Sequence, residues 1–207
     1  MAHDGSREEP KPIPFFKSLR DNAGSLRDNA GPPAVFKTYP ELYGPWSQMS
    51  QAMMNGPSPL SPAERELILA FTAGVAGCTF VHVAHAQVAY EWGIEDGLVE
   101  RLVENFASAA LEPRLRPLLA FVRKLTLTPA DMQQADADAV FAAGWDEQAL
   151  HDAIAITARM SFMQKLVEGH GFVPLTKEVA REHAKKRVQL GYVNLYPAFA
   201  RKDAAQK

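Results

Sequence analysis

The sequence predicts an all-α protein that folds as a compact helical bundle. Apolar residues recur at helical spacing in segments bounded by Gly or Pro, and no alternating apolar–polar run is enclosed by hairpin turns. With 207 residues, the chain is long enough to bury a substantial core in one domain. We expect this domain to cover residues 34–190, after a flexible arm over 1–33 and before a tail over 191–207.

The helices can be placed in order from their start and stop signals. Residues 34–54 are expected to form two short helices divided near Pro40. The next helix has Ser61 as N-cap, Pro62 at the first helical position and Glu64 completing a Ser-x-x-Glu capping box, and it should end near Gly77. Further helices are expected over 79–92, 95–108, 113–125, 132–143, 147–168 and 175–189.

Composition excludes several classes of function. A formal net charge of -2 gives no overall field that would attract nucleic acid or an anionic membrane. The sequence contains neither a secretory signal nor an apolar run of membrane length, so we expect no membrane partner. Because the single cysteine cannot form an internal disulfide, a cytoplasmic location is predicted.

The segment from Gly77 to Tyr90 contains the residues that could take part in a reaction. On a helix that turns by about 100° per residue, Cys78, Val81, His82 and His85 share one face. The preceding helix adds Glu66, which is followed directly by three large aliphatic residues. A carboxylate in such a setting needs a partner if it is buried, and His85 or His82 can supply one.

Two stretches carry a resemblance to a known family: Leu60-Ser-Pro-Ala-Glu-Arg-Glu-Leu-Ile68 and Gly77-Cys-Thr-Phe-Val-His-Val-Ala-His-Ala-Gln-Val-Ala89. They resemble the alkylhydroperoxidase D (AhpD) core of the carboxymuconolactone decarboxylase superfamily, and its peroxidase-related members most of all. Those members are also similar at Tyr39–Leu42 and at Ala142-Ala-Gly-Trp145. The likeness covers roughly residues 33–172 and implies an AhpD-like helical fold, peroxidase-type antioxidant activity and a homo-oligomer.

The family pattern is a glutamate followed twelve residues later by Cys-x-x-Cys-x-x-x-His. Glu66, Cys78 and His85 match it, whereas Val81 occupies the position of the second cysteine. In the family that second cysteine is oxidised by the peroxide, the first closes a disulfide, and the Glu–His pair transfers protons. The resemblance therefore implies a preserved scaffold that lacks its redox pair.

Three functions remain open. In the first, Cys78 is the only redox thiol of a weak peroxidase that uses an external thiol reductant. His82 or His85 would then accept the proton and Glu66 would orient a histidine, while a start of the helix close to Cys78 would favour its thiolate. In the second, Glu66 and His85 perform non-redox lyase chemistry on a small organic acid, as carboxymuconolactone decarboxylases do, with Arg65 or Arg159 holding the carboxylate. In the third, the chain is a non-catalytic family member.

Each candidate residue also has a structural alternative. Cys78 can be an inert buried residue, His85 a core histidine, and Glu66 a structural partner of Arg65. Glu66, His82 and His85 could share a metal ion, but the chain offers no second His–carboxylate pair to complete the shell, so no metal is predicted. No phosphate-binding loop, dinucleotide fingerprint or Gly-x-Ser-x-Gly element is present, and no cofactor is expected.

Overall fold

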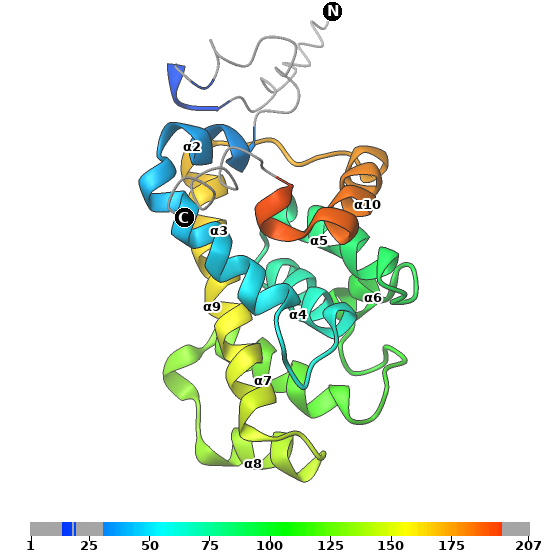
Figure 1. The fold of residues 1–207 in the computed structure, drawn as a ribbon. Helices are drawn as coiled ribbons and strands as arrows, with labels where there is room; N and C mark the ends of the chain where they lie inside the picture. The colour runs from blue at the N-terminus through cyan, green and yellow to red at the C-terminus, as the bar shows by residue number, and fades with distance from the viewer. Residues whose placement is uncertain (1–13, 18, 20–30, 196–207) are drawn as a thin grey trace, which may run out of the picture.

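A computed structural model describes residues 14–17, 19 and 31–195 of the chain, and the described residues form an all-α fold without strands (Figure 1). The predicted fold class is therefore confirmed. The helices are α2 (Pro32–Thr38), α3 (Pro40–Asn55), α4 (Pro62–Val75), α5 (Thr79–Glu91), α6 (Leu98–Glu104), α7 (Leu115–Leu127), the short 3-10 helix η2 (Pro129–Asp131), α8 (Gln134–Ala142), α9 (Glu147–His170) and α10 (Lys177–Asn194).

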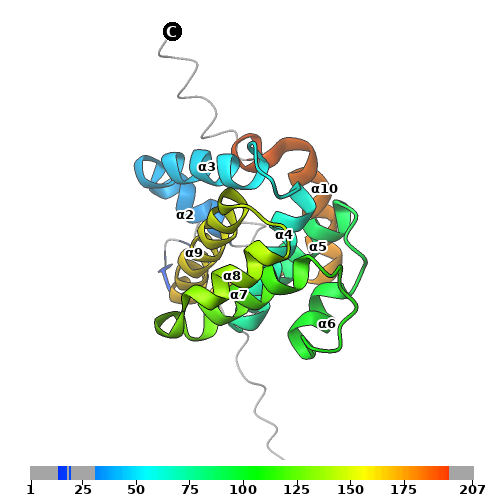
Figure 2. The ribbon, with the colours of Figure 1, turned by 90° about the horizontal axis from the view of Figure 1, so that it is seen from below.

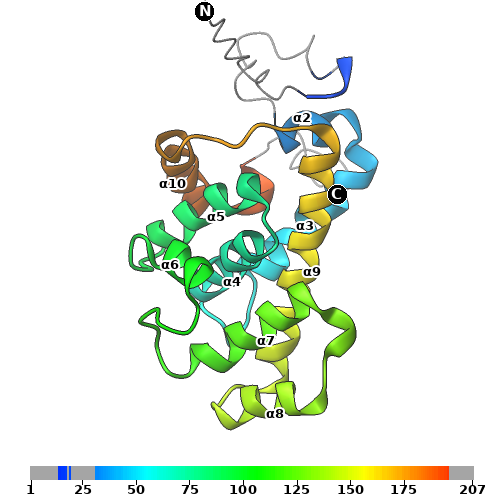
Figure 3. The same ribbon diagram turned by 180° about the vertical axis from the view of Figure 1, so that it is seen from behind.

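Helix α4 forms the centre of the bundle. It packs against α5, α6, α7 and α9, and its residues 65–73 are all buried (Figures 1 and 3). A helix that is buried on every side needs apolar residues around its whole circumference, and the Leu67–Phe71 run supplies them. Glu66 is thus carried into the core because its helix has no solvent-facing side at that point.

The start of α4 is the one the sequence predicts. The Ser61 hydroxyl accepts a hydrogen bond from the Glu64 N–H, and the Glu64 carboxylate accepts one from the Ser61 N–H at 2.7 Å. Such a cap stabilises a helix by about 1 kcal/mol. It fixes the register of α4, and with it the position of Glu66 one turn into the helix.

Helices α4 and α5 form the pair on which the candidate residues lie. The connection passes through Gly77, whose φ of 73° lies in the left-handed region that favours glycine. Helix α9, with 24 residues, is the longest described helix and packs along α4. Seen from below, α4 lies in the middle of the molecule, with α2, α3 and α9 on one side and α5, α6 and α10 on the other (Figure 2).

The C-terminal helix extends further than the sequence suggests. Helix α10 packs on α5 and α3 and continues to Asn194, so the expected domain boundary at residue 190 falls inside it. The backbone at Gly191 is non-helical, with φ 69° and ψ −158°, and this kink turns the last residues of α10 toward the bundle. Most of the predicted arm and tail lies outside the described residues. Among the described helices, none combines the length and apolarity that crossing a membrane would require.

Candidate functional site

A cavity of about 280 Å³ lies where α2, α3, α5, α9 and α10 meet. One wall is apolar and includes Phe36, Trp46, Phe80, Val81, Val88 and Met163. The polar part of the lining, called the polar wall, adjoins it on α3, α5, α9 and α10 and includes Ser50, His85, Arg159, Lys186, Arg187 and Tyr192. We call this space the His85 cavity.

His85 and Glu66 form a buried pair at the base of the cavity. His85 Nδ1 lies 2.7 Å from Glu66 Oε2, and the two residues are only 7% and 1% exposed. The contact joins α5 to α4, because His85 faces the central helix across the helical pair. The predicted Glu66–His85 partnership is therefore present in the geometry, and His85 also lines the cavity whereas Glu66 lies behind it.

The protonation states of this pair follow from burial and hydrogen bonding. Burial lowers the pKa of His85 to about 4, and the neighbouring Glu66 offsets this only in part, so the imidazole is neutral at pH 7. Burial alone would raise the pKa of Glu66, but the interaction with His85 and hydrogen bonds from His85 and Tyr192 outweigh it and leave the pKa below its ordinary value. An ionised Glu66 can only accept, so we assign the His85 proton to Nδ1 and the lone pair to Nε2.

Tyr192 is a third member of this cluster that the sequence analysis missed. Its hydroxyl donates to Glu66 Oε1 at 2.7 Å, so both oxygens of the carboxylate accept a hydrogen bond from a buried side chain. The residue falls in the segment expected to be a tail. The available signal was the apolar pair Tyr192 and Val193 directly after Gly191, a residue that often marks a break in a helix.

The polar wall carries positive charge. Arg159 is 5% exposed, and its Nε donates to Ser50 Oγ at 3.1 Å. Its guanidinium lies 4.9 Å from the centre of the Tyr192 ring, and that of Arg187 lies 4.7 Å from the same ring. Lys186 adds a further cation. This wall is suited to an anionic group.

Val81 occupies the wall of the cavity beside His85, where the family pattern has its second cysteine. Its side chain is buried at 2% exposure and offers no nucleophile. Trp46 and Phe80 extend the apolar wall around it. The position that His85 would be best placed to activate is thus filled by an aliphatic group.

Cys78 lies outside the cavity, contrary to the expectation of a shared site. It is the N-cap of α5, it is completely buried, and it is not among the lining residues. The expected stabilisation of its thiolate by the helix start is outweighed, because burial raises the pKa of the Cys78 thiol to about 11. The start of α5 does favour the thiolate, because backbone hydrogen bonds from Val81 and Phe80 lower the pKa, but desolvation outweighs them.

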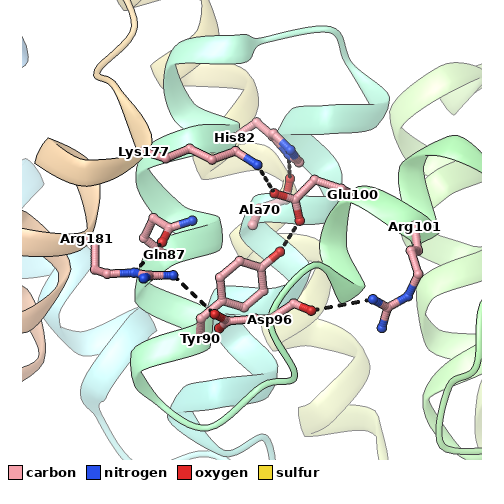
Figure 4. A network of polar contacts seen from close by, with 9 residues as sticks. All are labelled: Ala70, His82, Gln87, Tyr90, Asp96, Glu100, Arg101, Lys177 and Arg181. Atoms are coloured by element: carbon pink, nitrogen blue, oxygen red, sulfur yellow. Dashed lines mark hydrogen bonds and ion pairs between the residues drawn. The ribbon is translucent and has the colours of Figure 1, made fainter.

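His82 also turns away from the cavity. Its Nδ1 lies 3.1 Å from the carbonyl oxygen of Ala70 on α4, a contact visible in Figure 4, and the ring packs beside Gly74. His82 is therefore not placed as the proton acceptor of Cys78, one of the two options that the sequence left open. His82 and His85 do share the face of α5 that contacts α4, as the spacing predicts, but they meet α4 about one turn apart and only His85 reaches the cavity.

Arg65 does not pair with Glu66 either. It is buried at 3% exposure and donates to the carbonyl oxygens of Met53 and Gly56, which fastens the α3–α4 connection to the core. Of the two arginines proposed as carboxylate ligands, Arg159 lines the cavity and Arg65 does not. Within the described part of the chain, no group of three or more His, Cys, Asp or Glu residues is arranged to hold a metal ion.

No known family model matches this sequence. No curated protein is similar to it either. Solved structures, however, share its fold. An uncharacterised peroxidase-related protein from a Silicibacter species superimposes with a TM-score of 0.65 at 22% identity, covering 84% of this chain and 97% of its own.

A second similar structure is the alkylhydroperoxidase AhpD core of an uncharacterised peroxidase-related protein from Ralstonia eutropha. It has a TM-score of 0.66 and 22% identity, and the match covers 84% of this chain and 98% of that one. The chain therefore has the AhpD-like fold of peroxidase-related proteins, as the sequence motifs predict.

Proposed function

We propose that this protein catalyses non-redox proton transfer on a small organic acid, with His85 as the acid–base group and Glu66 as its orienting partner. The observation that carries the proposal is the composition of the His85 cavity. A neutral histidine with a carboxylate behind it faces a space with cationic residues on its wall, and the only cysteine of the chain lies elsewhere. This is the second of the three functions that the sequence leaves open.

In the proposed reaction, His85 Nε2 removes a proton from a carbon next to a carbonyl or carboxylate group. The C–H electron pair moves onto the neighbouring carbonyl oxygen as an enolate, and the imidazolium returns the proton to the same or another carbon. Glu66 stabilises the imidazolium through Nδ1–H, as a carboxylate does for the histidine of a catalytic triad. The enolate charge would be stabilised by Arg159 and Arg187, because both cations lie close to the reaction space.

The size and lining of the cavity also indicate the class of substrate. Its volume of about 280 Å³ lies just below the usual range for small-molecule sites, so it suits a small substrate. The aromatic and aliphatic wall suits a compact apolar body, and the wall with Arg159, Lys186 and Arg187 suits one carboxylate. A small keto, hydroxy or unsaturated carboxylate meets both requirements.

The thiol mechanism is less well supported. A peroxide has to reach the sulfur, and Cys78 is fully buried away from the cavity. The thiolate is the nucleophile, and a pKa of about 11 keeps Cys78 protonated at neutral pH. The third function, a binding protein without catalysis, agrees with the loss of the second cysteine but leaves the buried Glu66–His85 pair without a role.

Deuterium exchange tests the proposal directly. The protein is incubated in D₂O with a panel of four- to ten-carbon keto, hydroxy and unsaturated carboxylates, and the loss of C–H signals is followed by proton NMR. We expect exchange in the wild type and in Cys78→Ala, and a loss of at least about 100-fold in His85→Gln. Exchange that persists in His85→Gln, or turnover of cumene hydroperoxide that is abolished by Cys78→Ala, would refute the proposal.

A further inference from the structure

Tyr192 connects the last turn of the chain's final described helix to the candidate catalytic pair. Its hydroxyl donates to Glu66 Oε1 at 2.7 Å while His85 Nδ1 lies 2.7 Å from Oε2. The Tyr192 and His85 rings are nearly parallel, with 8° between their planes and 6.3 Å between their centroids. The carboxylate is therefore held from both sides by two stacked rings.

The backbone of α10 is shaped to deliver this hydroxyl. At Gly191 the chain leaves helical geometry with φ 69°, and the next N–H, that of Tyr192, donates to Gln51 Oε1 of α3 at 2.6 Å. A Cβ at Gly191 would collide with the Gln51 side-chain oxygen. The glycine and the glutamine together turn Tyr192 inward, instead of letting it continue along the surface of α10.

The other end of α10 is fastened to α5 and α6, as Figure 4 shows. Arg181 bonds to Gln87 at 3.3 Å and to Asp96 at 3.1 Å, and Lys177 bonds to Glu100 at 3.2 Å. These contacts fix the direction in which α10 crosses the bundle. The position of the Tyr192 hydroxyl is thus determined at both ends of the helix.

We infer that Tyr192 is a positioning residue that holds the Glu66 carboxylate ionised and correctly oriented, and so keeps the His85 lone pair on Nε2. This inference rests on the proposed role of His85 in proton transfer. Tyr192 acts through Glu66, since its hydroxyl is bonded to the carboxylate and not directed to a substrate. Burial raises the pKa of Tyr192, and Glu66 raises it further, so the phenol remains a donor at every working pH.

Loss of the hydroxyl should change the titration of His85 in a defined direction. A buried carboxylate that loses one of its two donors becomes more basic, and it then stabilises the imidazolium more strongly. The charged or titratable groups that face His85 or line its cavity are Glu66 on α4 and Arg159 on α9, and on α10 they are His183, Lys186, Arg187 and Tyr192. The substitution Tyr192→Phe leaves the other groups in place, so we expect the pKa of His85 to rise by roughly one unit.

The experiment is a pH titration of histidine ring signals by NMR, on the full chain with isotope-labelled histidine and without substrate. The matched control is Tyr90→Phe, because the Tyr90 hydroxyl also bonds to a carboxylate, that of Glu100, outside the His85 cavity. In Tyr192→Phe we expect the His85 midpoint to move up by roughly one pH unit and the ring to lose its single tautomer. In Tyr90→Phe it should not move.

A second variant separates positioning from folding. Gln51→Ala removes the acceptor for the Tyr192 N–H but leaves the phenol and Gly191 intact, so it should shift the His85 midpoint in the same direction by a smaller amount. An unchanged His85 midpoint in a folded Tyr192→Phe protein, or an equal shift in Tyr90→Phe, would overturn the inference.

The NMR titration tests the positioning role of Tyr192, and the deuterium-exchange assay tests the proposed function, so one can be refuted without the other. If the His85 midpoint moves while no carboxylate exchanges deuterium, Tyr192 positions Glu66 as inferred and the proposed function is wrong. If exchange is found, Tyr192→Phe should also move the acidic limb of its pH profile upward by the same amount as the NMR midpoint. Exchange whose pH profile is unaltered by Tyr192→Phe would refute the positioning role and leave the proposed function standing.

Discussion

Replacing Val81 by cysteine puts a thiol on the wall of the His85 cavity, at the position where the family pattern has its reactive residue. Val81 lines the cavity and is one helical turn before His85, whereas Cys78 is sealed in the core. If this placement is correct, the two positions should differ sharply in thiol reactivity. The substitution conserves an apolar side chain of similar size, so it should cost less than about 1.5 kcal/mol of stability.

The size of the difference follows from the ionisation of each thiol. With a pKa of about 11, Cys78 is ionised at pH 7 in about one molecule in 10⁴, whereas an ordinary thiol with a pKa near 8.5 is ionised in about 3%. Ionisation alone therefore predicts a difference of roughly 300-fold. Arg159 and Arg187 should widen it, since nearby cations stabilise a thiolate.

Alkylation by iodoacetamide at pH 7, followed by intact-mass spectrometry, measures this difference. The Val81→Cys/Cys78→Ala double variant isolates the new thiol, and the wild type reports Cys78 alone. We expect the double variant to react at least about 100-fold faster than the wild type. Rates within threefold of each other would show that the cavity does not expose position 81, and the assignment of the site would then be wrong.

Three further outcomes follow from the same structure. Burial lowers the pKa of His85 from 6.5 to about 4, so the unfolded chain binds the proton more tightly than the folded one. The free energy of unfolding should therefore fall by up to about 3 kcal/mol as the pH is lowered from 6.5 to 4. Urea unfolding should show a weaker pH dependence of this free energy in His85→Gln. Arg65→Leu should destabilise the protein by about 3 kcal/mol in thermal unfolding, since two buried carbonyls lose their donor, and Arg65→Lys should lose less. Leu42 is 61% exposed on α3 and is a candidate contact of the predicted homo-oligomer. Light scattering should give a particle mass that is a multiple of the 22.8 kDa chain mass, and Leu42→Asp should lower that particle mass.

The fold could be predicted from the sequence because its strongest signals are local. The Ser61–Glu64 capping box, the division of α2 from α3 near Pro40 and the glycine turn at Gly77 all depend on residues close together in the chain. The pairing of Glu66 with His85 was also predictable, because each residue lies on a strongly marked helix and the two helices adjoin. The similarity in fold to peroxidase-related proteins agrees with these local signals.

The membership of the cavity could not be predicted in the same way. Helical spacing places Cys78, His82 and His85 on one face, but it gives neither the depth of a side chain nor the element that covers it. Cys78 is buried by packing at the start of α5, and His82 is taken up by a carbonyl of α4. Tyr192 reaches Glu66 over 126 residues of sequence, through a kink at Gly191 whose direction no local pattern gives.

Of the three tryptophans of this chain, Trp46 alone lines the His85 cavity, whereas Trp92 and Trp145 do not. Trp46 lies on the wall of the His85 cavity, with its ring centroid 4.1 Å from that of Phe162. Trp145, between α8 and α9, is 4% exposed, with the Arg114 guanidinium 3.6 Å from its ring centre and its N–H bonded to the Arg114 carbonyl. A molecule that enters the cavity should therefore change the fluorescence of Trp46, while Trp92 and Trp145 contribute emission from outside the cavity. The change in emission on binding offers a way to screen ligands before any reaction is known.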